Sequence, residues 1–345
     1  MPSGRLWAWK SGCKVSVAII VNPRAGHDVR RLIAPAHNVS DQEKVGIIRR
    51  VLVALDALSV SEIWLMPDDA GISHKALSGC HLHSKLRWLA IPIHGVPDDT
   101  RMAAKAAVKE GVRVLVTLGG DGTNRLVVRE AEQTPIVPIS TGTNNAFPVM
   151  MDGTLAGLAA GLVAEGYVKA QKAVRVRPKL EVRINGQSPD IALVDVMATD
   201  DTFVASRAIW EWAQWREAVV LAPQVPVIGV ASMVVALQGF EETGAPGMHF
   251  LFGPGKDTVM APISPGLIGK IPIVSANRIV PETPITFEKW RGSLALDGER
   301  EYMISPKQSV SVRLLADGVR IIDIWRCFNE AARSKVWTRL ADFTL

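Results

Sequence analysis

The first 150 residues alternate between short apolar runs and amphipathic stretches, and this alternation limits the possible folds more than any other feature. Runs rich in β-branched residues cover 15–21, 63–66, 88–93, 112–118 and 136–139. Such runs are typical of strands buried on both faces of a parallel sheet. Between them, residues 40–58 place apolar side chains on one helical face behind a Ser40 cap, and a second helix should follow Asp98-Asp99. The alternation predicts an open, doubly wound parallel sheet.

The second half of the chain has a different pattern. After a helix expected over 154–165, strand-like segments cover 179–184, 191–196, 284–287, 293–296 and 310–314. Asn-Gly or Asp-Gly pairs at 185–186, 297–298 and 317–318 are typical of tight hairpin turns. This pattern predicts an antiparallel β-sandwich. We therefore expect an α/β domain over 14–150, a β-sandwich domain over 151–327 and a C-terminal helix over 328–345.

Composition narrows the classes of function. A chain of 345 residues is long enough for two domains, and 48% hydrophobic with 21% charged residues is ordinary for a globular enzyme. The net charge of +5 is spread along the chain without a run of like charges, so we expect no nucleic-acid partner. The cysteines Cys13, Cys80 and Cys327 are odd in number and far apart. They argue against a disulfide framework and predict a cytoplasmic location.

The longest uncharged stretch covers 218–237, but Pro223 and Pro226 would disrupt a membrane-spanning helix. It predicts instead a buried pair of strands, or a strand and a short helix. Trp210, Trp212 and Trp215 fall in an expected helix. Packing in the core or at a dimer interface is favoured for them over membrane contact, because Trp is costly to expose. We expect no membrane contact and leave a homo-oligomer open.

A glycine-rich loop follows the fourth predicted strand, with the sequence Gly119-Gly120-Asp121-Gly122-Thr123. Glycines allow backbone amides to approach phosphates closely, and the N-terminus of a following helix favours negative charge. An aspartate would repel phosphates, so it predicts a proton acceptor for an attacking hydroxyl or a ligand of a metal that neutralises the phosphates. A tight turn with a helix cap is the structural alternative.

Two more polar loops follow predicted strands. One runs from Ser140 to Asn145 and is dense in hydrogen-bond donors suited to phosphate or ribose oxygens; the other runs from Asn22 to Gly26. Either could be a plain turn when taken alone. All three loops lie at the carboxyl end of a parallel strand, where ligands bind in open α/β sheets. No Gly-x-Gly-x-x-Gly fingerprint or Walker A motif occurs in the sequence.

Together, in this order, the motifs resemble those of the superfamily that unites NAD kinases, diacylglycerol kinases and sphingosine kinases. The glycine-rich loop is the hallmark of this superfamily. The other motifs occur in the order expected for it: Asn22-Pro23 before the glycine-rich loop, then the loop starting at Gly142-Thr143, then Asp297-Gly298-Glu299. Within it, residues 22–32 and 140–148 look like the NAD kinase-like branch known as acetoin catabolism protein X. The similarity covers about residues 15–324.

This resemblance implies an ATP-dependent kinase with its active site in the cleft between a nucleotide-binding and an acceptor-binding domain. Its acceptor would be a hydroxyl of a nucleotide or another small molecule. Asp121 would be the general base or the organiser of the attacking hydroxyl, and Glu299 a second candidate base. The nucleotide pocket would consist of Asn22, Pro23, Gly26, Gly119, Gly120, Gly122, Thr123, Thr141, Gly142, Thr143, Asn144 and Asn145. Mg²⁺ would accompany ATP, because phosphoryl transfer depends on neutralised and positioned phosphates. We expect no separate metal site in the protein.

Two alternatives stay open. The chain could be a lipid kinase acting on diacylglycerol or a sphingoid base, or a nucleotide sensor without catalytic activity. The Asn-Glu pair with which NAD kinases hold the adenosine end of NAD is not evident in the middle of the sequence. The resemblance therefore covers the ATP side of the site and leaves the acceptor unassigned.

Overall fold

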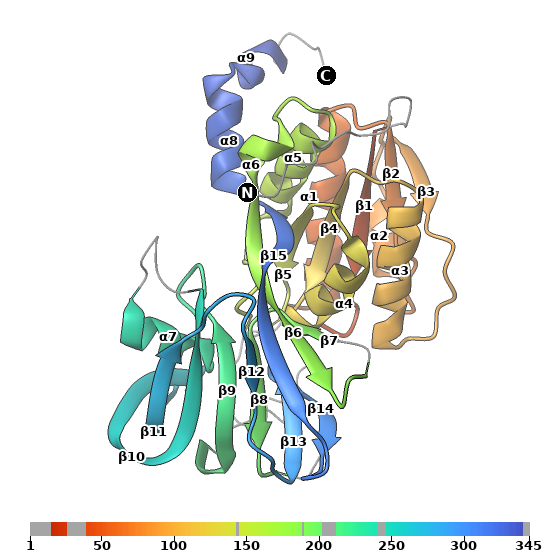
Figure 1. The fold of residues 1–345 in the computed structure, drawn as a ribbon. Helices are drawn as coiled ribbons and strands as arrows, with labels where there is room; N and C mark the ends of the chain where they lie inside the picture. Colours follow the sequence, from red (N-terminus) through yellow and green to blue (C-terminus); the bar gives the residue numbers. More distant parts are fainter. Residues whose placement is uncertain are drawn as a thin grey trace.

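The computed structural model describes residues 15–25, 39–142, 145–187, 190–201, 212–239 and 246–340. These residues form a nine-stranded mixed sheet and a six-stranded antiparallel sheet (Figure 1). The architecture confirms the predicted combination of a doubly wound parallel sheet with an antiparallel sandwich.

The parallel part of the larger sheet comes from the first 140 residues. Its strands lie in the order β3-β2-β1-β4-β5. They are β1 (Ser16–Val21), β2 (Glu62–Leu65), β3 (Lys85–Trp88), β4 (Val114–Gly119) and β5 (Ile136–Ser140).

The apolar run at 88–93 misplaced the third strand. The observed strand, β3, lies earlier in the chain and already ends at Trp88. Pro92 in that run has no backbone N–H to donate to a sheet. An edge strand with little buried surface does not need a continuous apolar run, which is why the pattern misplaced it.

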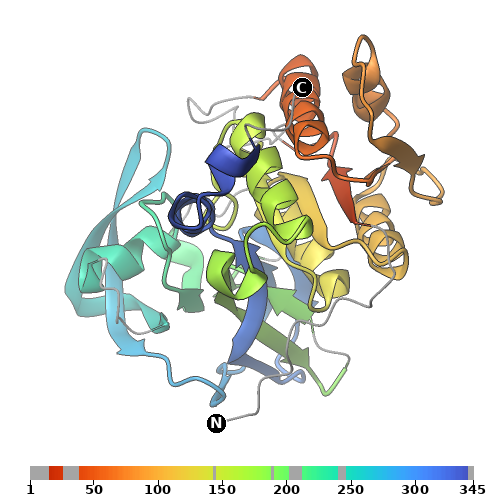
Figure 2. The ribbon, with the colours of Figure 1, turned by 90° about the horizontal axis from the view of Figure 1, so that it is seen from above.

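Helices cover both faces of the parallel strands (Figure 2). On one face, Val17, Ile19 and Val21 pack in a common core with α1 (Asp41–Ala57), α2 (Ile72–Leu77) and α5 (Gly153–Ala164). On the other, Ala18 and Ile20 pack with α3 (Pro97–Lys109) and α4 (Asp121–Ala131). Ser40 caps α1 as expected, since its Oγ accepts the amide of Glu43 at 3.1 Å.

Strands from the second half of the chain extend this sheet. They are β6 (Val174–Ile184), which follows the short α6 (Ala170–Ala173), with β7 (Asp190–Ala192), β12 (Pro284–Thr286) and β15 (Val310–Ile322). The end of β15 lies beside β5, where Ile321 pairs with Ile136, and β6 flanks β15 on its other side. The larger sheet is thus not confined to the first 150 residues, and the domain boundaries given above stay predictions.

The second sheet has the order β11-β10-β9-β8-β13-β14. Its strands are β8 (Asp195–Thr199), β9 (Trp215–Leu221), β10 (Gly247–Ser264), β11 (Leu267–Arg278), β13 (Gly292–Leu296) and β14 (Glu299–Ile304). Leu180 and Val312 of the first sheet share a buried core with Val196 and Leu294 of the second. This shared core makes the lower half of the molecule a sandwich (Figure 1).

Two of the three predicted turns connect neighbouring strands. Asn185 and Gly186 both have positive φ, 49° and 68°, as do Asp297 and Gly298, 52° and 78°. Positive φ at both positions is typical of type I′ hairpin turns, which favour Asn-Gly and Asp-Gly. The prediction at 317–318 is wrong: β15 continues through Gly318 with an irregularity between Leu315 and Val319. A side chain at Gly318 would collide with the backbone of Arg177, so close strand packing explains this glycine.

The expected tryptophan helix is also wrong. Trp212 lies in the short 3₁₀ turn Trp212–Gln214, Trp215 begins β9, and Trp210 lies outside the described residues. The uncharged stretch 218–237 contains the end of β9 and most of α7 (Ala231–Gln238), which confirms one of its two interpretations. Within the described part of the chain, no helix is both long and apolar enough to cross a membrane.

The predicted C-terminal helix begins earlier and is broken. It consists of α8 (Ile324–Arg333) and α9 (Val336–Leu340), separated at Lys335, whose φ is 53°. The Asp323 carboxylate accepts the amide of Arg326 at 2.9 Å and so fixes the start of α8. Both helices pack on the same core as α1 and α5, next to the first sheet (Figure 2).

Candidate functional site

The carboxyl ends of β1 and β4 form the topological switch point of the parallel sheet. These strands are neighbours, but the helix after β1 covers one face and the helix after β4 covers the other. The two loops therefore diverge, which opens a crevice at this edge in folds of this type. The amide of Asn22 still binds the carbonyl of Leu118 at 3.0 Å, so the loops begin in direct contact.

Asn22 and the glycine-rich loop contact each other directly. Asn22 Nδ2 donates to Thr123 Oγ1 at 2.8 Å, and Asn22 Oδ1 accepts the amide of Arg24 at 2.9 Å. A side chain at Gly119 would collide with the side chain of Thr123. Glycine at 119 is thus required by the close approach of Thr123 and not by a positive φ.

The loop after β5 joins the same cluster. The amide of Thr141 donates to the carbonyl of Gly119 at 3.2 Å. Asn145 lies between two glycines: a Cβ on Gly120 would lie 2.9 Å from its Oδ1, and a Cβ on Gly142 would lie 2.7 Å from its Nδ2. The structure therefore brings together the three loops that the sequence predicted to share one edge of the sheet.

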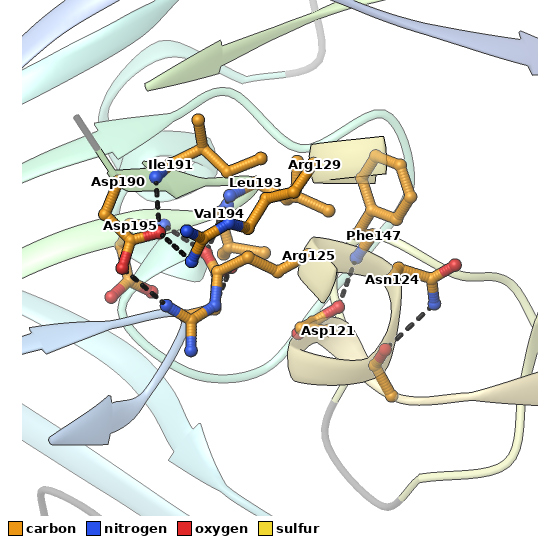
Figure 3. A network of polar contacts seen from close by, with 12 residues as sticks. Asp121, Asn124, Arg125, Arg129, Phe147, Asp190, Ile191, Leu193, Val194 and Asp195 are labelled. Atoms are coloured by element: carbon orange, nitrogen blue, oxygen red, sulfur yellow. Dashed lines mark hydrogen bonds and ion pairs between the residues drawn. The ribbon is translucent and has the colours of Figure 1, made fainter. Parts of the chain in front are cut away.

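Asp121 is the first residue of α4 and is only 8% exposed. Its Oδ1 accepts the amide of Phe147 at 2.8 Å (Figure 3). Its Oδ2 accepts the amide of Ala146 at 3.0 Å. Both carboxylate oxygens are thus engaged by the turn that follows Asn145. A role for Asp121 as general base stays a prediction.

Asn124 fixes the start of α4 from inside the fold. Its side chain is fully buried and accepts from Thr117 Oγ1 at 2.7 Å. It also donates to the carbonyl of Gly120 at 2.8 Å (Figure 3). The N-cap residue, Gly120, makes no side-chain cap for this helix. Helix N-termini without a side-chain cap can bind anions such as phosphate.

Thr141 offers a further polar group at this edge. Thr141 is fully buried, and its Oγ1 has no hydrogen-bond partner in the described structure. A buried hydroxyl without a partner carries a free-energy cost that a water or a ligand oxygen would relieve.

Two basic residues that we did not predict hold the loop after β1. Lys44 is fully buried, and its Nζ donates to the carbonyl of Pro23 at 2.5 Å and pairs with Asp41 at 3.1 Å. Arg24 Nε donates to the carbonyl of Gly95 at 2.9 Å, while its Nη2 pairs with Asp69 at 3.0 Å. Lys44 could have been found from the sequence, because it lies on the apolar face of its helix; Arg24 gave no comparable signal.

A small cavity of about 40 Å³ lies beside this loop. Its lining includes Asn22, Arg24, Asp68, Asp69 and Asp99. Since Asp68 caps α2 and Asp99 accepts the amides of two residues in the loop after β3, these carboxylates also stabilise the local backbone. The cavity has room for a few waters but not for a nucleotide.

An acidic and basic cluster connects α4 to the second sheet (Figure 3). Arg125 is 5% exposed and lies 3.7 Å from Asp190 and 3.8 Å from Asp297. Arg129, one turn further along α4, pairs with Asp190 at 3.0 Å, and Tyr302 donates to the same carboxylate at 2.5 Å. Sequence analysis missed this cluster, because its members come from three separate segments: α4, β7 and the hairpin of β13 and β14.

Asp297 belongs to the Asp-Gly-Glu motif, and its position indicates a structural role. Its Oδ1 accepts the amides of Leu193 and Val194, each at 2.8 Å. Burial raises the pKa of the Asp297 carboxyl well above its usual range, and the nearby Arg125 guanidinium opposes this shift.

Some predicted site residues cannot be placed. Gly26, Thr143 and Asn144 lie outside the described residues. Glu299 begins β14, but its side chain also lies outside them. Its role as a second base therefore stays a prediction.

Comparison with known proteins supports one family. Acetoin catabolism protein X of Cupriavidus necator is 34% identical to this chain over 333 residues, which cover 92% of each protein. This chain belongs to the acetoin catabolism protein X family. Residues 178–317 of this family member match the acetoin catabolism protein X C-terminal domain, and residues 17–167 match the ATP-NAD kinase N-terminal domain. The predicted resemblance is confirmed.

Two solved structures are similar to this acetoin catabolism protein X family member over most of its length. Yeast NADH kinase complexed with NADH has 12% sequence identity and a TM-score of 0.46, covering 94% of this chain and 88% of that one. A putative diacylglycerol kinase from Bacillus anthracis has the same identity and TM-score, covering 90% and 98%.

Proposed function

We propose that this protein is a kinase that transfers a phosphoryl group from ATP to a hydroxyl of a nucleotide or another small molecule. The observation that carries the proposal is the convergence of three loops at the switch point, where Thr123 contacts Asn22 and Asn145 packs between Gly120 and Gly142. The match of residues 17–167 to the ATP-NAD kinase N-terminal domain supports the same assignment.

The triphosphate would lie over the glycine-rich loop. The N-terminus of α4, whose N-cap residue Gly120 makes no side-chain cap, favours negative charge. The unpartnered hydroxyl of Thr141 suits a phosphate or ribose oxygen. Phosphoryl transfer through a loose transition state depends mainly on positioning and electrostatic stabilisation, so the site does not require a strong base.

Mg²⁺ would supply charge neutralisation on the transferred phosphates. Among the described residues, no group of three or more His, Cys, Asp or Glu side chains could hold a metal. A magnesium ion that arrives with ATP would take most of its ligands from phosphates and water. We further propose that the protein acts in the cytoplasm.

A second function, nucleotide sensing without catalysis, is favoured by one observation. Both oxygens of Asp121 accept backbone amides, as they would if this residue only stabilised the loop. A sensor would bind ATP in the same pocket and transfer nothing.

A coupled assay of ADP release tests the proposal. Mg²⁺-ATP is supplied with NAD, NADH, a diacylglycerol or a panel of small alcohols, and each is compared with ATP alone. We expect one soluble acceptor to stimulate ADP release at least 10-fold. We also expect Asp121→Asn to abolish that stimulation, because the substitution disturbs the loop after β5. Asp98→Asn is the matched control, because Asp98 lies exposed on α3 and pairs with Arg101.

The other outcomes identify the alternatives. Stimulation by the diacylglycerol alone would indicate a lipid kinase. ATP binding without release for any acceptor would favour the sensor. Full activity of Asp121→Asn would show that this residue has no role in catalysis.

A further inference from the structure

Phe147 is held from two directions. Its amide donates to the carboxylate of Asp121, while its carbonyl accepts from Arg177 Nη1 at 2.9 Å. The guanidinium of Arg177 also lies over the Phe147 ring, 4.8 Å from the ring centre. Asp121 comes from α4 and Arg177 from β6, so two distant elements hold the same residue.

The turn 145–147 is also part of the loop that contacts the glycine-rich motif. At its start, Asn145 Nδ2 donates to Ser140 Oγ at 2.6 Å, while its side chain packs against Gly120 and Gly142. A displacement of Phe147 would therefore move Asn145 and change the surface offered to phosphates.

Charge supports this arrangement. Arg177 is partly buried, and burial lowers the pKa of its guanidinium to about 10, while the nearby Asp121 carboxylate opposes the shift. A guanidinium with this pKa stays charged at neutral pH. Arg177 thus remains a cation beside Asp121 in any ordinary buffer.

We propose that Asp121, Phe147 and Arg177 form a latch that fixes the turn 145–147 for phosphate binding, with Arg177 as a positioning residue. This inference rests on the proposed function only for the identity of the ligand. Asp121 then acts through the turn it holds, and Arg177 couples the β6 strand to the nucleotide loops. Arg177 lies outside every motif that the sequence analysis singled out.

Binding and hydrogen exchange on the full-length protein test the latch. Binding of Mg²⁺-ATP and of inorganic tripolyphosphate is measured by calorimetry for the wild type, Arg177→Met, Arg177→Lys and Arg183→Met. We expect Arg177→Met to weaken both ligands at least 10-fold and Arg177→Lys to recover part of the loss, because lysine keeps the charge and one donor. Arg183→Met is the matched control on the same strand, since its exposed side chain pairs with Glu181. It should change binding less than 2-fold.

Exchange of the Ala146 and Phe147 amides gives a readout that needs no ligand. Both amides bind the Asp121 carboxylate, so they should exchange at least 10-fold faster in Arg177→Met, while β1 and β4 amides stay unchanged. If Arg177→Met leaves exchange or ATP binding at wild-type values, the latch is wrong. Failure of the folded wild type to bind either ligand would overturn the proposed function and the phosphate role of the latch, while exchange would still decide whether Arg177 holds the turn.

Discussion

At the scale of single residues, the glycine-rich loop depends on contacts too close for any side chain. Gly119 has no room for a Cβ because Thr123 occupies that space, and Thr123 Oγ1 in turn accepts a hydrogen bond from Asn22 Nδ2. Thr123 is β-branched and has few rotamers to escape into. The need for glycine at this position therefore comes from packing between two loops.

We predict that Gly119→Ala destabilises the protein by about 1–3 kcal/mol, as overpacking of a tight site does. Gly46→Ala is the control of opposite sign. Gly46 lies inside α1, where a Cβ would meet only the end of the flexible Arg50 side chain at 3.4 Å, so alanine there should stabilise by about 0.5–1 kcal/mol. Urea denaturation of both variants measures the two changes. Equal stability of Gly119→Ala and wild type would contradict the packing argument.

At the scale of elements, α4 links the glycine-rich loop to the two sheets. Its first turn belongs to the glycine-rich loop, and Asn124 ties it to β4. Arg125 and Arg129 both lie against Asp190 of β7 in the first sheet, and Arg125 also lies against Asp297 at the edge of the second (Figure 3). A helix held at both its first turn and its outer face can carry little independent motion. The placement of the nucleotide loop thus depends on how α4 is seated.

We predict that Asn124→Leu costs about 1–3 kcal/mol of folding free energy, because it leaves the buried Thr117 hydroxyl without this partner and removes one of the two hydrogen bonds to the Gly120 carbonyl. The double variant with Thr117→Val should lose less than the sum of the single losses, since it also removes the hydroxyl that Asn124→Leu leaves without this partner. Equilibrium unfolding of the three variants gives this coupling. Strict additivity would show that the hydrogen bond between the two side chains carries no free energy.

At the scale of the whole molecule, the two sheets meet through buried charge as well as through an apolar core. Asp190 and Asp297 belong to the second half of the chain, while Arg125 belongs to the first. Removal of one partner from such a buried group is costly, because the other charge stays desolvated. Stability of the whole fold should therefore respond to the protonation of Asp297.

We predict a pH dependence of stability that Asp297→Asn removes. Burial raises the pKa of Asp297 in the folded protein, so the folded state binds the proton more tightly than the unfolded chain. The stabilisation from this proton is complete below the unfolded pKa of about 4 and is lost as pH rises through the raised value. The unfolding free energy of the wild type minus that of Asp297→Asn should fall as pH rises, by at most about 1.4 kcal/mol per pH unit.

Urea denaturation at a series of pH values below and above about 4 measures this difference. Asp98→Asn serves for comparison, because the hydrogen bond from Arg101 lowers the pKa of Asp98. Its contribution has the opposite sign: it is present above the unfolded pKa and is lost as pH falls. A difference for Asp297→Asn that stays flat with pH would contradict the prediction.

The sequence by itself determined the features that depend on local pattern. Apolar runs and helical periodicity located four of the five parallel strands and the helices α1, α3 and α5, but not α2. Asn-Gly and Asp-Gly located two hairpins, because these signals lie within a few residues. The order of strand and loop also placed the three site loops at one edge of the sheet. Nothing beyond the direction of parallel strands is needed for that inference.

Only the tertiary structure decided the long-range partners. The pairing of Ile321 with Ile136, the collision that requires Gly318 and the meeting of Arg177 with Phe147 all join segments far apart in the chain. Trp215 entered a strand because it packs against Phe252 of β10 in a buried sheet, although its neighbourhood had suggested a helix. Such contacts depend on the packing of complete elements, which overrides local preference and leaves no periodic signal in a single sequence.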